Sequence, residues 1–358
     1  MLIDLDIPSA SYQVRMGESI DELGSRLGKF TDSGRIFLLT DENVAALHLD
    51  RVSLSLMKAN FETLVFEIAS GEEHKNLDTV RRIYDFMSCS KLERFTPVLG
   101  FGGGVVGDLA GFVASTYLRG LPFFNAPTSL LAQVDSAVGG KTGLNLSSGK
   151  NLVGTFYQPG YVHSDVELLK TLTEREYSSG LAEVVKHALI EGEKFLSYLE
   201  SNVEAIMNRD SSVMKLVVSE CVKIKAYVVK NDEREEGLRR ILNLGHTLGH
   251  AIEKSAGYGK VTHGEGVSIG MVFAALLAEN RGSTGLVERL SKLLSSMNLP
   301  VRIDSKLEPD KLISAMELDK KVRDGKIEFV LPLDLGNVIP GINLDSIELN
   351  ETLLKMYE

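Results

Sequence analysis

Cysteine is scarce and tryptophan is absent in this chain of 358 residues: Cys89 and Cys221 are the only thiols. Two cysteines are too few for a disulfide framework or for a metal site built from thiolates. Such low cysteine usage is typical of proteins that reside in a reducing compartment. We therefore expect a cytoplasmic protein.

Long apolar runs and an excess of positive charge are also missing. No uninterrupted apolar stretch approaches the roughly 20 residues that span a bilayer. Residues 1–6 (MLIDLD) carry acidic groups instead of the basic start of a signal peptide, and they favour a strand. The formal net charge of -10 offers no general attraction to polyphosphate or anionic lipid. We expect no nucleic-acid or membrane partner, although local basic residues still permit small anionic substrates.

The pattern of the chain changes near Leu168. Before it, β-rich runs at 35–40, 63–68 and 96–101 alternate with helical patterns at 42–58 and 76–91, which is typical of βαβ units around a parallel sheet. After it, 3.6-residue periodicity predicts helices at 174–191, 211–229, 238–255 and 265–281, then a strand at 327–332 and a helix at 344–357. We predict an N-terminal α/β domain (1–170) and a mostly helical domain (171–358).

A glycine-rich segment follows the third predicted strand. Gly102, Gly104 and Gly107 fit G-x-G-x-x-G between a strand and a helix, where backbone N–H groups can hold a pyrophosphate. Close packing of helix against strand would select the same glycines, so the pattern alone leaves both interpretations open. The later GGKTG segment (139–143) lacks the first glycine of a nucleotide-binding P-loop, because residue 135 is Asp.

Three residues from separate segments form a candidate metal site. Glu183, His246 and His263 each lie in a glycine-containing segment, and two imidazoles with one carboxylate are the ligands of catalytic zinc sites that keep an open position. His246 and His250 are four residues apart, as are Arg239 and Asn243, so a single helix would place all four on one polar face. The alternative for each histidine is an ordinary packed or solvated side chain.

Long segments of the chain resemble the 3-dehydroquinate synthase family. The resemblance rests on GGGVVGD (102–108), YLRG (117–120), PTSLLAQVD (127–135), GGKTG (139–143), GKN (149–151), GLAEVVK (180–186), NLGHTLGHAIE (243–253), HGEG (263–266) and DKK (319–321). Ser129 stands where the family usually has threonine, which keeps the hydroxyl.

The resemblance implies an N-terminal Rossmann-like parallel-sheet domain that binds NAD, a C-terminal mostly α-helical domain that binds Zn2+ or Co2+, and a homodimer. It implies that Glu183, His246 and His263 are the metal ligands. The residues implied to contact NAD are Asp41, Asn43, Gly71, Glu72, Lys75, Gly104, Val105, Val106, Gly107, Asp108, Thr128, Ser129, Lys141, Lys150, Leu168, Leu169, Lys170 and Thr171. Those implied to serve the sugar phosphate and catalysis are Arg119 (toward the neighbouring subunit's substrate), Asp135, Lys141, Asn151, Lys186, Lys225, Arg239, Asn243, His250 and Lys320 or Lys321.

The implied reaction converts 3-deoxy-D-arabino-heptulosonate 7-phosphate to 3-dehydroquinate and phosphate. Its steps are transient oxidation at C5 by NAD, phosphate elimination, re-reduction, ring opening and intramolecular aldol closure. His250 is the candidate proton relay at the C2 hydroxyl, with a purely orienting role as its alternative.

Two other enzyme classes and one non-enzymatic class compete with this interpretation. A cyclase making a valiolone or inosose ring would share the metal and NAD residues. A metal-dependent polyol dehydrogenase of similar design would form net NADH without releasing phosphate. A nucleotide-binding scaffold protein would have no need for Glu183, His246, His263, Lys186 and Arg239 together.

Overall fold

The computed structural model describes residues 1–257, 259–317, 322–323 and 326–357. By internal contacts the chain divides into two compact units: unit 1 is Met1–Leu172 with Met214–Glu233, and unit 2 is Thr173–Val213 with Arg234–Glu358. Residues 214–233, which we assigned to the second domain from sequence, thus group with the first. They form most of helix α8 (Ser211–Asn231), whose Lys225 binds Asp135 of unit 1. No helix of the described part of the chain is long and apolar enough to cross a membrane.

Unit 1 is built on a seven-stranded sheet with the order β1-β2-β9-β6-β5-β3-β4. Only the β1–β2 pair is antiparallel, and the other neighbours are parallel. The predicted strands at 35–40, 63–68 and 96–101 correspond to β3, β4 and β5, three adjacent strands. The strand bounds are β1 Leu2–Ile7, β2 Ala10–Met16, β3 Arg35–Asp41, β4 Glu62–Ile68, β5 Val98–Gly102, β6 Phe123–Pro127 and β9 Tyr161–Ser164.

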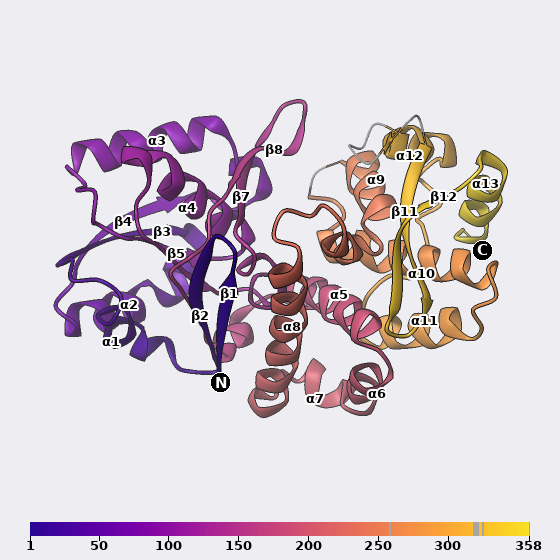
Figure 1. Ribbon diagram of the computed structural model, residues 1–358, viewed down its shortest axis with the longest axis horizontal. Helices are drawn as coiled ribbons and strands as arrows, with labels where there is room; N and C mark the ends of the chain where they lie inside the picture. The colour runs from indigo at the N-terminus through magenta and orange to yellow at the C-terminus, as the bar shows by residue number, and fades with distance from the viewer. Residues whose placement is uncertain (258, 318–321, 324–325, 358) are drawn as a thin grey trace. The chain divides into compact units, whose positions relative to one another are not determined.

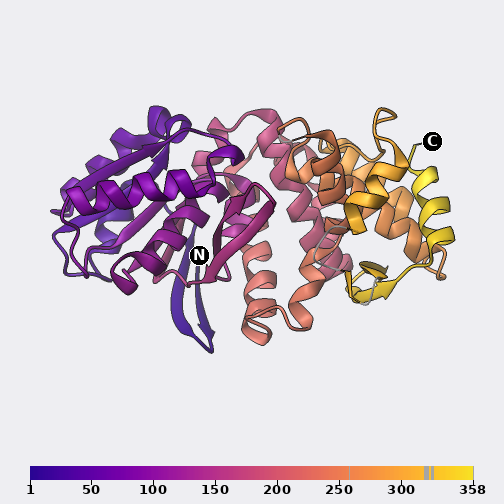
Figure 2. The same ribbon diagram turned by 90° about the horizontal axis from the view of Figure 1, so that it is seen from above.

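Helices cover both faces of this sheet (Figures 1 and 2). The helices are α1 (Leu23–Leu27), α2 (Glu42–Lys58), α3 (Leu77–Cys89) and α4 (Gly104–Thr116). Residues of α3 and α4, including Ile83 and Val113, form one buried apolar cluster with Phe37 of β3. Residues of α1 and α2, including Leu27 and Leu56, form a second cluster on the other face. The two clusters hold the carboxyl ends of the parallel strands at one edge, where sheets of this kind bind ligands.

A hairpin that the sequence analysis did not assign follows β6. Strands β7 (Lys141–Leu146) and β8 (Gly149–Phe156) pair antiparallel and form a separate two-stranded sheet. A short π-helical segment, Ala132–Ser136, precedes the hairpin, and the 3-10 segment η5 (Val166–Thr171) ends the first part of unit 1.

Unit 2 is mostly helical, as predicted, with one small three-stranded sheet (Figure 1). Its helices are α5 (Glu174–Glu191), α6 (Glu193–Ser201), α7 (Val203–Met207), α9 (His246–Ala256), α10 (His263–Glu279), α11 (Leu286–Ser296), α12 (Pro309–Glu317) and α13 (Ser346–Lys355). Its strands are β10 (Val322–Arg323), β11 (Lys326–Asp334) and β12 (Asn337–Asn343). The predicted strand at 327–332 lies inside β11.

The prediction of one continuous helix over 238–255 is wrong. The structure has a 3-10 segment, η6 (Leu238–Asn243), followed by α9, and Gly245 between them has a left-handed backbone with φ +80°. That conformation interrupts the helix and is readily adopted by glycine. Arg239 and Asn243 therefore do not continue the helical face of His246 and His250.

Helices α9 and α10 pack unusually closely through glycines. A side-chain Cβ at Gly270 would lie 1.9 Å from the Gly245 carbonyl oxygen, and one at Gly266 would lie 2.8 Å from the Gly249 oxygen. Real Cβ atoms essentially never come within 3.0 Å of such atoms. The glycines that precede His246 and His250 thus allow α10 to approach α9, and this brings His263 next to His246.

Candidate active site

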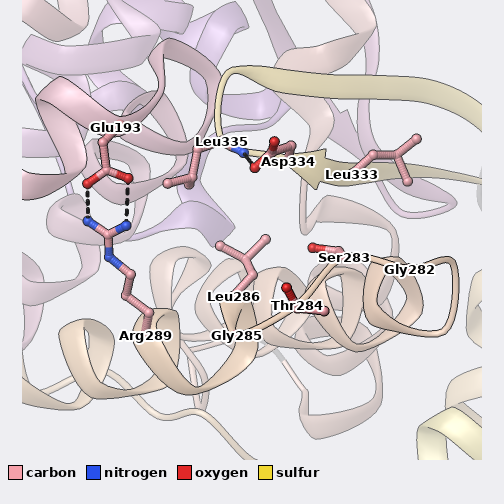
Figure 3. Close-up of a pocket in the computed structure, with 10 residues that line it drawn as sticks. All are labelled: Glu193, Gly282, Ser283, Thr284, Gly285, Leu286, Arg289, Leu333, Asp334 and Leu335. Atoms are coloured by element: carbon pink, nitrogen blue, oxygen red, sulfur yellow. Dashed lines mark hydrogen bonds and ion pairs between the residues drawn. The ribbon is translucent and has the colours of Figure 1, made fainter.

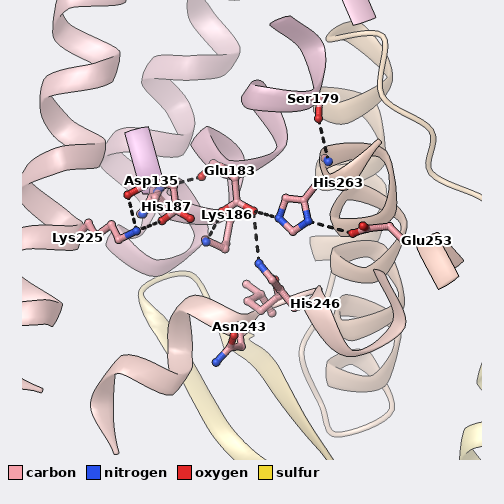
Figure 4. A network of polar contacts seen from close by, with 12 residues as sticks. Asp135, Ser179, Glu183, Lys186, His187, Lys225, Asn243, His246, Glu253 and His263 are labelled. Carbon is pink, nitrogen blue, oxygen red and sulfur yellow. Dashed lines mark hydrogen bonds and ion pairs between the residues drawn. The ribbon is translucent and has the colours of Figure 1, made fainter. Parts of the chain in front are cut away.

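The three predicted metal ligands converge within unit 2 (Figure 4). Glu183 comes from the middle of α5, His246 from the first residue of α9 and His263 from the first residue of α10. Glu183 Oε1 lies 3.6 Å from His246 Nε2 and 3.3 Å from His263 Nε2. Glu183 is completely buried at the centre of this histidine–glutamate cluster.

The spacing of these atoms fits a bound metal ion. Ligand atoms around a tetrahedral zinc ion, with bonds near 2.0–2.1 Å, are about 3.3–3.4 Å apart. The two measured separations lie close to that value, and one ligand atom from each of the three residues falls within 4.8 Å of the others. A carboxylate and two imidazoles also suit zinc or cobalt chemically.

The second nitrogen of each ring is already engaged, which defines the nitrogen that faces the cluster. His246 Nδ1 lies 3.0 Å from the Leu244 carbonyl oxygen, and His263 Nδ1 lies 3.0 Å from Glu253 Oε1. Because a carbonyl or carboxylate oxygen accepts, Nδ1 carries the hydrogen in both rings. With the hydrogen on Nδ1, the neutral form of each ring offers its Nε2 lone pair to an ion, which is the usual arrangement of metal-binding histidines.

The two rings differ in their electrostatics. Burial, aided by the charge of Lys186, holds the pKa of His246 well below its ordinary value, so this ring is neutral and suited to metal binding. Burial also acts to lower the pKa of His263, but hydrogen bonds to Glu183 and Glu253 outweigh it and raise that pKa to about 10. Without a metal, His263 is a cation between two carboxylates, and an ion would take the place of its Nε2 proton.

Lys186 completes the charge balance of the cluster. It lies one turn after Glu183 on α5, forms an ion pair with Glu183 Oε2, and is buried to 1% exposure. A buried ammonium group beside a buried carboxylate is costly to desolvate and is retained where it has a chemical use. Arg239, also buried, and Asn243, whose amide donates to Glu235 Oε1, lie in η6 just before the cluster helix α9. His250 is one turn beyond His246, with ring centroids 5.4 Å apart.

The glycine-rich segment of unit 1 has the predicted strand-loop-helix form. Strand β5 ends at Gly102, α4 begins at Gly104, and no side chain caps the first turn of α4. This leaves backbone N–H groups at a helix N-terminus, which favours an anionic phosphate. Close packing contributes as well, since a Cβ at Gly102 would lie 2.6 Å from a methyl group of Val106.

A buried polar network lies beside this helix. Lys75 Nζ donates to Asp108 Oδ2 at 2.5 Å and to Asn151 Oδ1 at 2.6 Å. Burial acts to lower the pKa of Lys75, but the charges of Asp108 and Glu72 outweigh it and raise the pKa. Three residues predicted to contact NAD, Glu72, Lys75 and Asp108, are thus grouped with Asn151, which was predicted to serve the substrate.

Sequence reasoning missed Asn145, which joins this network. Its side chain donates to Glu72 Oε1 at 2.8 Å and accepts from the Asn151 N–H at 2.9 Å, while its own N–H donates to the Lys75 carbonyl at 2.7 Å. These bonds hold Asn151 in a left-handed backbone with φ +53°. An asparagine inside an unassigned hairpin gave no signal in the sequence.

Asp135 and Lys225, both in unit 1, form another ion pair between predicted site residues. Lys225 Nζ lies 2.5 Å from Asp135 Oδ1 and also donates to the Asp135 carbonyl. Both residues were predicted to lie near the substrate from positions 90 residues apart. The ion pair is largely buried on the lysine side, with the Lys225 side chain 7% exposed.

The other predicted NAD-contacting residues lie at the carboxyl ends of the strands or nearby. Asp41 caps α2 by accepting from the N–H groups of Asn43 and Val44. Thr128 and Ser129 follow β6, and the Thr128 N–H donates to the Gly102 carbonyl. The η5 segment carries Thr171, which contacts His48, and Lys170, which binds Glu167 on the surface, whereas the side chains of Leu168 and Leu169 are buried.

The remaining predicted residues include two lysines of the β7–β8 hairpin and Arg119. Lys141 is exposed at the first position of β7, and Lys150 is half-buried in β8. Arg119, in a short 3-10 turn, has a left-handed backbone with φ +67°. Lys320 and Lys321 lie outside the described residues.

Unit 2 also contains a hollow of about 350 Å3, and none of its lining residues belongs to the histidine–glutamate cluster (Figure 3). It is lined by the 282–286 loop, the 333–335 segment, and the paired side chains of Glu193 and Arg289. The guanidinium of Arg289 is bound by Glu193 and Glu200, and Arg289 holds the pKa of Glu193 near 2. This guanidinium is already neutralised, and the hollow has no histidine among its lining residues.

Comparison with solved structures identifies the class of protein. The chain superimposes on a 2-epi-5-epi-valiolone synthase from Streptomyces hygroscopicus subsp. jinggangensis 5008, solved with NAD+ and Zn2+, with TM-score 0.89, 27% identity and coverage of 98% of both chains. It has the same fold as a 2-deoxy-scyllo-inosose synthase solved with carbaglucose-6-phosphate, NAD+ and Co2+, with TM-score 0.90, 24% identity and coverage of 99% of this chain and 100% of that one. The fold is that of the sugar phosphate cyclases.

Sequence comparisons identify the family within that class. Residues 65–179 match the model of the 3-dehydroquinate synthase N-terminal domain, and residues 180–322 match that of the C-terminal domain. A 3-dehydroquinate synthase from Desulforamulus reducens is 48% identical over 94% of both chains. The chain belongs to the 3-dehydroquinate synthase family, which confirms the resemblance noted in the sequence.

Proposed function

We propose that the protein is a 3-dehydroquinate synthase, a lyase that converts 3-deoxy-D-arabino-heptulosonate 7-phosphate to 3-dehydroquinate and phosphate in the shikimate route to aromatic amino acids. The observation that carries the proposal is the convergence of Glu183, His246 and His263 in a chain similar to curated 3-dehydroquinate synthases over 94% of its length. The similarity to these relatives supports the reaction, and the cluster contains the metal-binding residues that this reaction requires.

The cofactors follow from the same comparison and from the fit of the residues. A divalent ion held by Glu183, His246 and His263 would act as a Lewis acid toward a substrate hydroxyl. NAD held against the N-terminus of α4 would accept a hydride from C5 and later return it, so that none is consumed. We propose zinc or cobalt as the ion, because both suit this set of ligands and each accompanies NAD+ in one of the solved cyclases.

The remaining polar residues are proposed to bind and orient the substrate. Lys186 and Arg239 are buried cations suited to the negative charge that develops during oxidation and phosphate loss. His250 is proposed to move a proton at the C2 hydroxyl, and Asn243 to orient the substrate hydroxyls. Further proposed contacts are Asp135, Lys141, Asn151, Lys225 and Lys320 or Lys321.

We also propose a cytoplasmic homodimer. The chain has only two cysteines, Cys89 and Cys221, and such low cysteine usage is typical of a reducing compartment. In the dimer, Arg119 of the partner subunit would reach the substrate phosphate, which gives its exposed, left-handed turn a function. Sedimentation of the purified protein tests the dimer directly.

The decisive experiment measures two products from the heptulosonate phosphate with zinc or cobalt and a catalytic amount of NAD. We expect equal amounts of phosphate and dehydroquinate, and no net NADH. His263→Ala should remain folded and lose both metal and turnover. Folded, metal-loaded protein that forms neither product would refute the assignment. Phosphate release only from another sugar phosphate would indicate a sister cyclase, and net NADH from glycerol would indicate a polyol dehydrogenase.

A further inference from the structure

Glu253 is a buried carboxylate that binds the far side of a proposed metal ligand. It lies on α9, seven residues after His246, so it is on the same helical face two turns away. Its Oε1 accepts from His263 Nδ1 at 3.0 Å, and the side chain is only 7% exposed. The opposite ring nitrogen, Nε2, faces Glu183 at 3.3 Å (Figure 4).

We propose that Glu253 is a positioning residue that sets the tautomer and the ring orientation of His263 for metal binding. The proposal rests on the proposed metal site of Glu183, His246 and His263. A neutral imidazole carries its single hydrogen on either nitrogen, and only the form with hydrogen on Nδ1 offers the Nε2 lone pair to an ion. An acceptor fixed at Nδ1 selects that form and restricts rotation of the ring.

His263 needs this support more than the other histidine of the cluster. His246 donates to the carbonyl of Leu244 two residues before it, so its ring is oriented by its own backbone segment. His263 is the first residue of α10, its side chain is 30% exposed, and the partner of its Nδ1 comes from a different helix. Glu253 thereby links α9 to α10 at the metal site.

The negative charge of Glu253 has a separate effect from its hydrogen bond. A carboxylate acceptor makes the imidazole more electron-rich than a neutral acceptor does, so the bond from Nε2 to the ion is stronger. Glu253→Gln retains an oxygen that can accept from Nδ1 but lacks the charge. Glu253→Ala removes both, so the two variants separate orientation from charge.

The test is metal affinity of the purified, metal-stripped protein, measured by titration with Zn2+ and with Co2+. Loss of a carboxylate that supports a metal-binding histidine weakens metal affinity about 10- to 100-fold. We expect that range for Glu253→Ala and a smaller loss for Glu253→Gln, together with a changed visible absorption spectrum of bound Co2+. In 15N spectra of the wild-type protein loaded with zinc, His263 should carry its hydrogen on Nδ1, and that hydrogen bond should be absent in Glu253→Ala.

Glu265 provides a matched control on the first turn of α10. It is a carboxylate that binds Arg175 and the Thr262 N–H, and it caps the helix without contacting either ring nitrogen of His263 in the bonds described. Glu265→Gln preserves the capping pattern while it removes a charge close to His263. Its metal affinity should remain within twofold of the wild type.

The outcomes separate this proposal from the metal site itself. Glu253→Ala with wild-type affinity and an unchanged Co2+ spectrum would overturn the role of Glu253, provided that His263→Ala loses the metal. If His263→Ala binds metal as tightly as the wild type, the proposed metal site is itself wrong. Should Glu253→Ala fail to fold, the 15N spectra of the zinc-loaded wild-type protein decide: a His263 ring with its hydrogen on Nε2, or with no hydrogen bond from Nδ1, would overturn the proposal.

Discussion

Substitution of Gly270 by alanine should disrupt the contact between α9 and α10. The new Cβ would lie 1.9 Å from the Gly245 oxygen, at least 1.1 Å inside the 3.0 Å limit (3.0 minus 1.9), and the obstacle is backbone that cannot rotate away. Overpacking of a core costs about 1–3 kcal/mol, occasionally more. Alanine recovers about 1 kcal/mol of helix propensity. Since a clash of this size belongs to the upper end of the overpacking range, we expect a net loss of about 2 kcal/mol in the free energy of unfolding.

The assay is chemical denaturation of the metal-free protein, followed by zinc titration. Gly34→Ala is the control, because a Cβ at Gly34 would meet nothing within 4 Å. Gly249→Ala would place its Cβ 2.9 Å from the nearest atom, so its stability should lie between those of Gly270→Ala and Gly34→Ala. Gly270→Ala should also bind zinc more weakly, since it separates the helices that carry His246 and His263. Stability within about 0.5 kcal/mol of the wild type, the ordinary range for surface substitutions, would refute the reasoning.

Two further predictions concern buried polar groups of unit 1. Lys75→Met should destabilise the protein by about 3 kcal/mol, because breaking a buried ion pair leaves Asp108 uncompensated. In chemical denaturation, the double variant Lys75→Met/Asp108→Leu should regain part of this lost stability. If the destabilisation of the double variant equals the sum of the two single substitutions, the pairing is contradicted. Burial lowers the pKa of His163, so below pH 6.5 the unfolded chain binds a proton that the folded one does not, and stability falls as pH drops. In His163→Gln, the free energy of unfolding should depend less on pH between pH 6.5 and 5 than in the wild type. Parallel plots of unfolding free energy against pH for the two proteins would argue against this.

Local signals in the sequence were sufficient for several elements. Helix α5 has the predicted bounds, Glu174–Glu191, because Thr173 caps its start and Gly192, with φ +114°, ends it. The helix predicted over 238–255 was wrong because periodicity does not reveal that Gly245 is left-handed. The grouping of residues 214–233 with unit 1 depends on tertiary contacts such as that of Lys225 with Asp135, which no local pattern encodes.

For the candidate site, the residue types could be predicted from the sequence, whereas their geometry required the structure. Glu183, His246 and His263 were identified because carboxylate and imidazole are metal-binding groups, and the structure adds that their ligand atoms lie within 4.8 Å. Which nitrogen of each histidine faces the cluster depends on Leu244 and Glu253, and spacing along the chain does not specify that. Asn145 acts through hydrogen bonds to Glu72, Lys75 and Asn151, so its place became apparent only in the structure.

The grouping of most of α8 with unit 1 has a consequence for folding during synthesis. A ribosome that has synthesised Met1–Leu172 has not yet produced Met214–Glu233, and the intervening residues belong to the other unit. The ion pair of Asp135 with Lys225 can form only after Lys225, ninety residues later in the chain, has been synthesised. Folding during synthesis often proceeds domain by domain from the N-terminus. Here the first unit is completed only after Glu233 leaves the exit tunnel, and the nascent chain depends on later residues to finish its earliest fold.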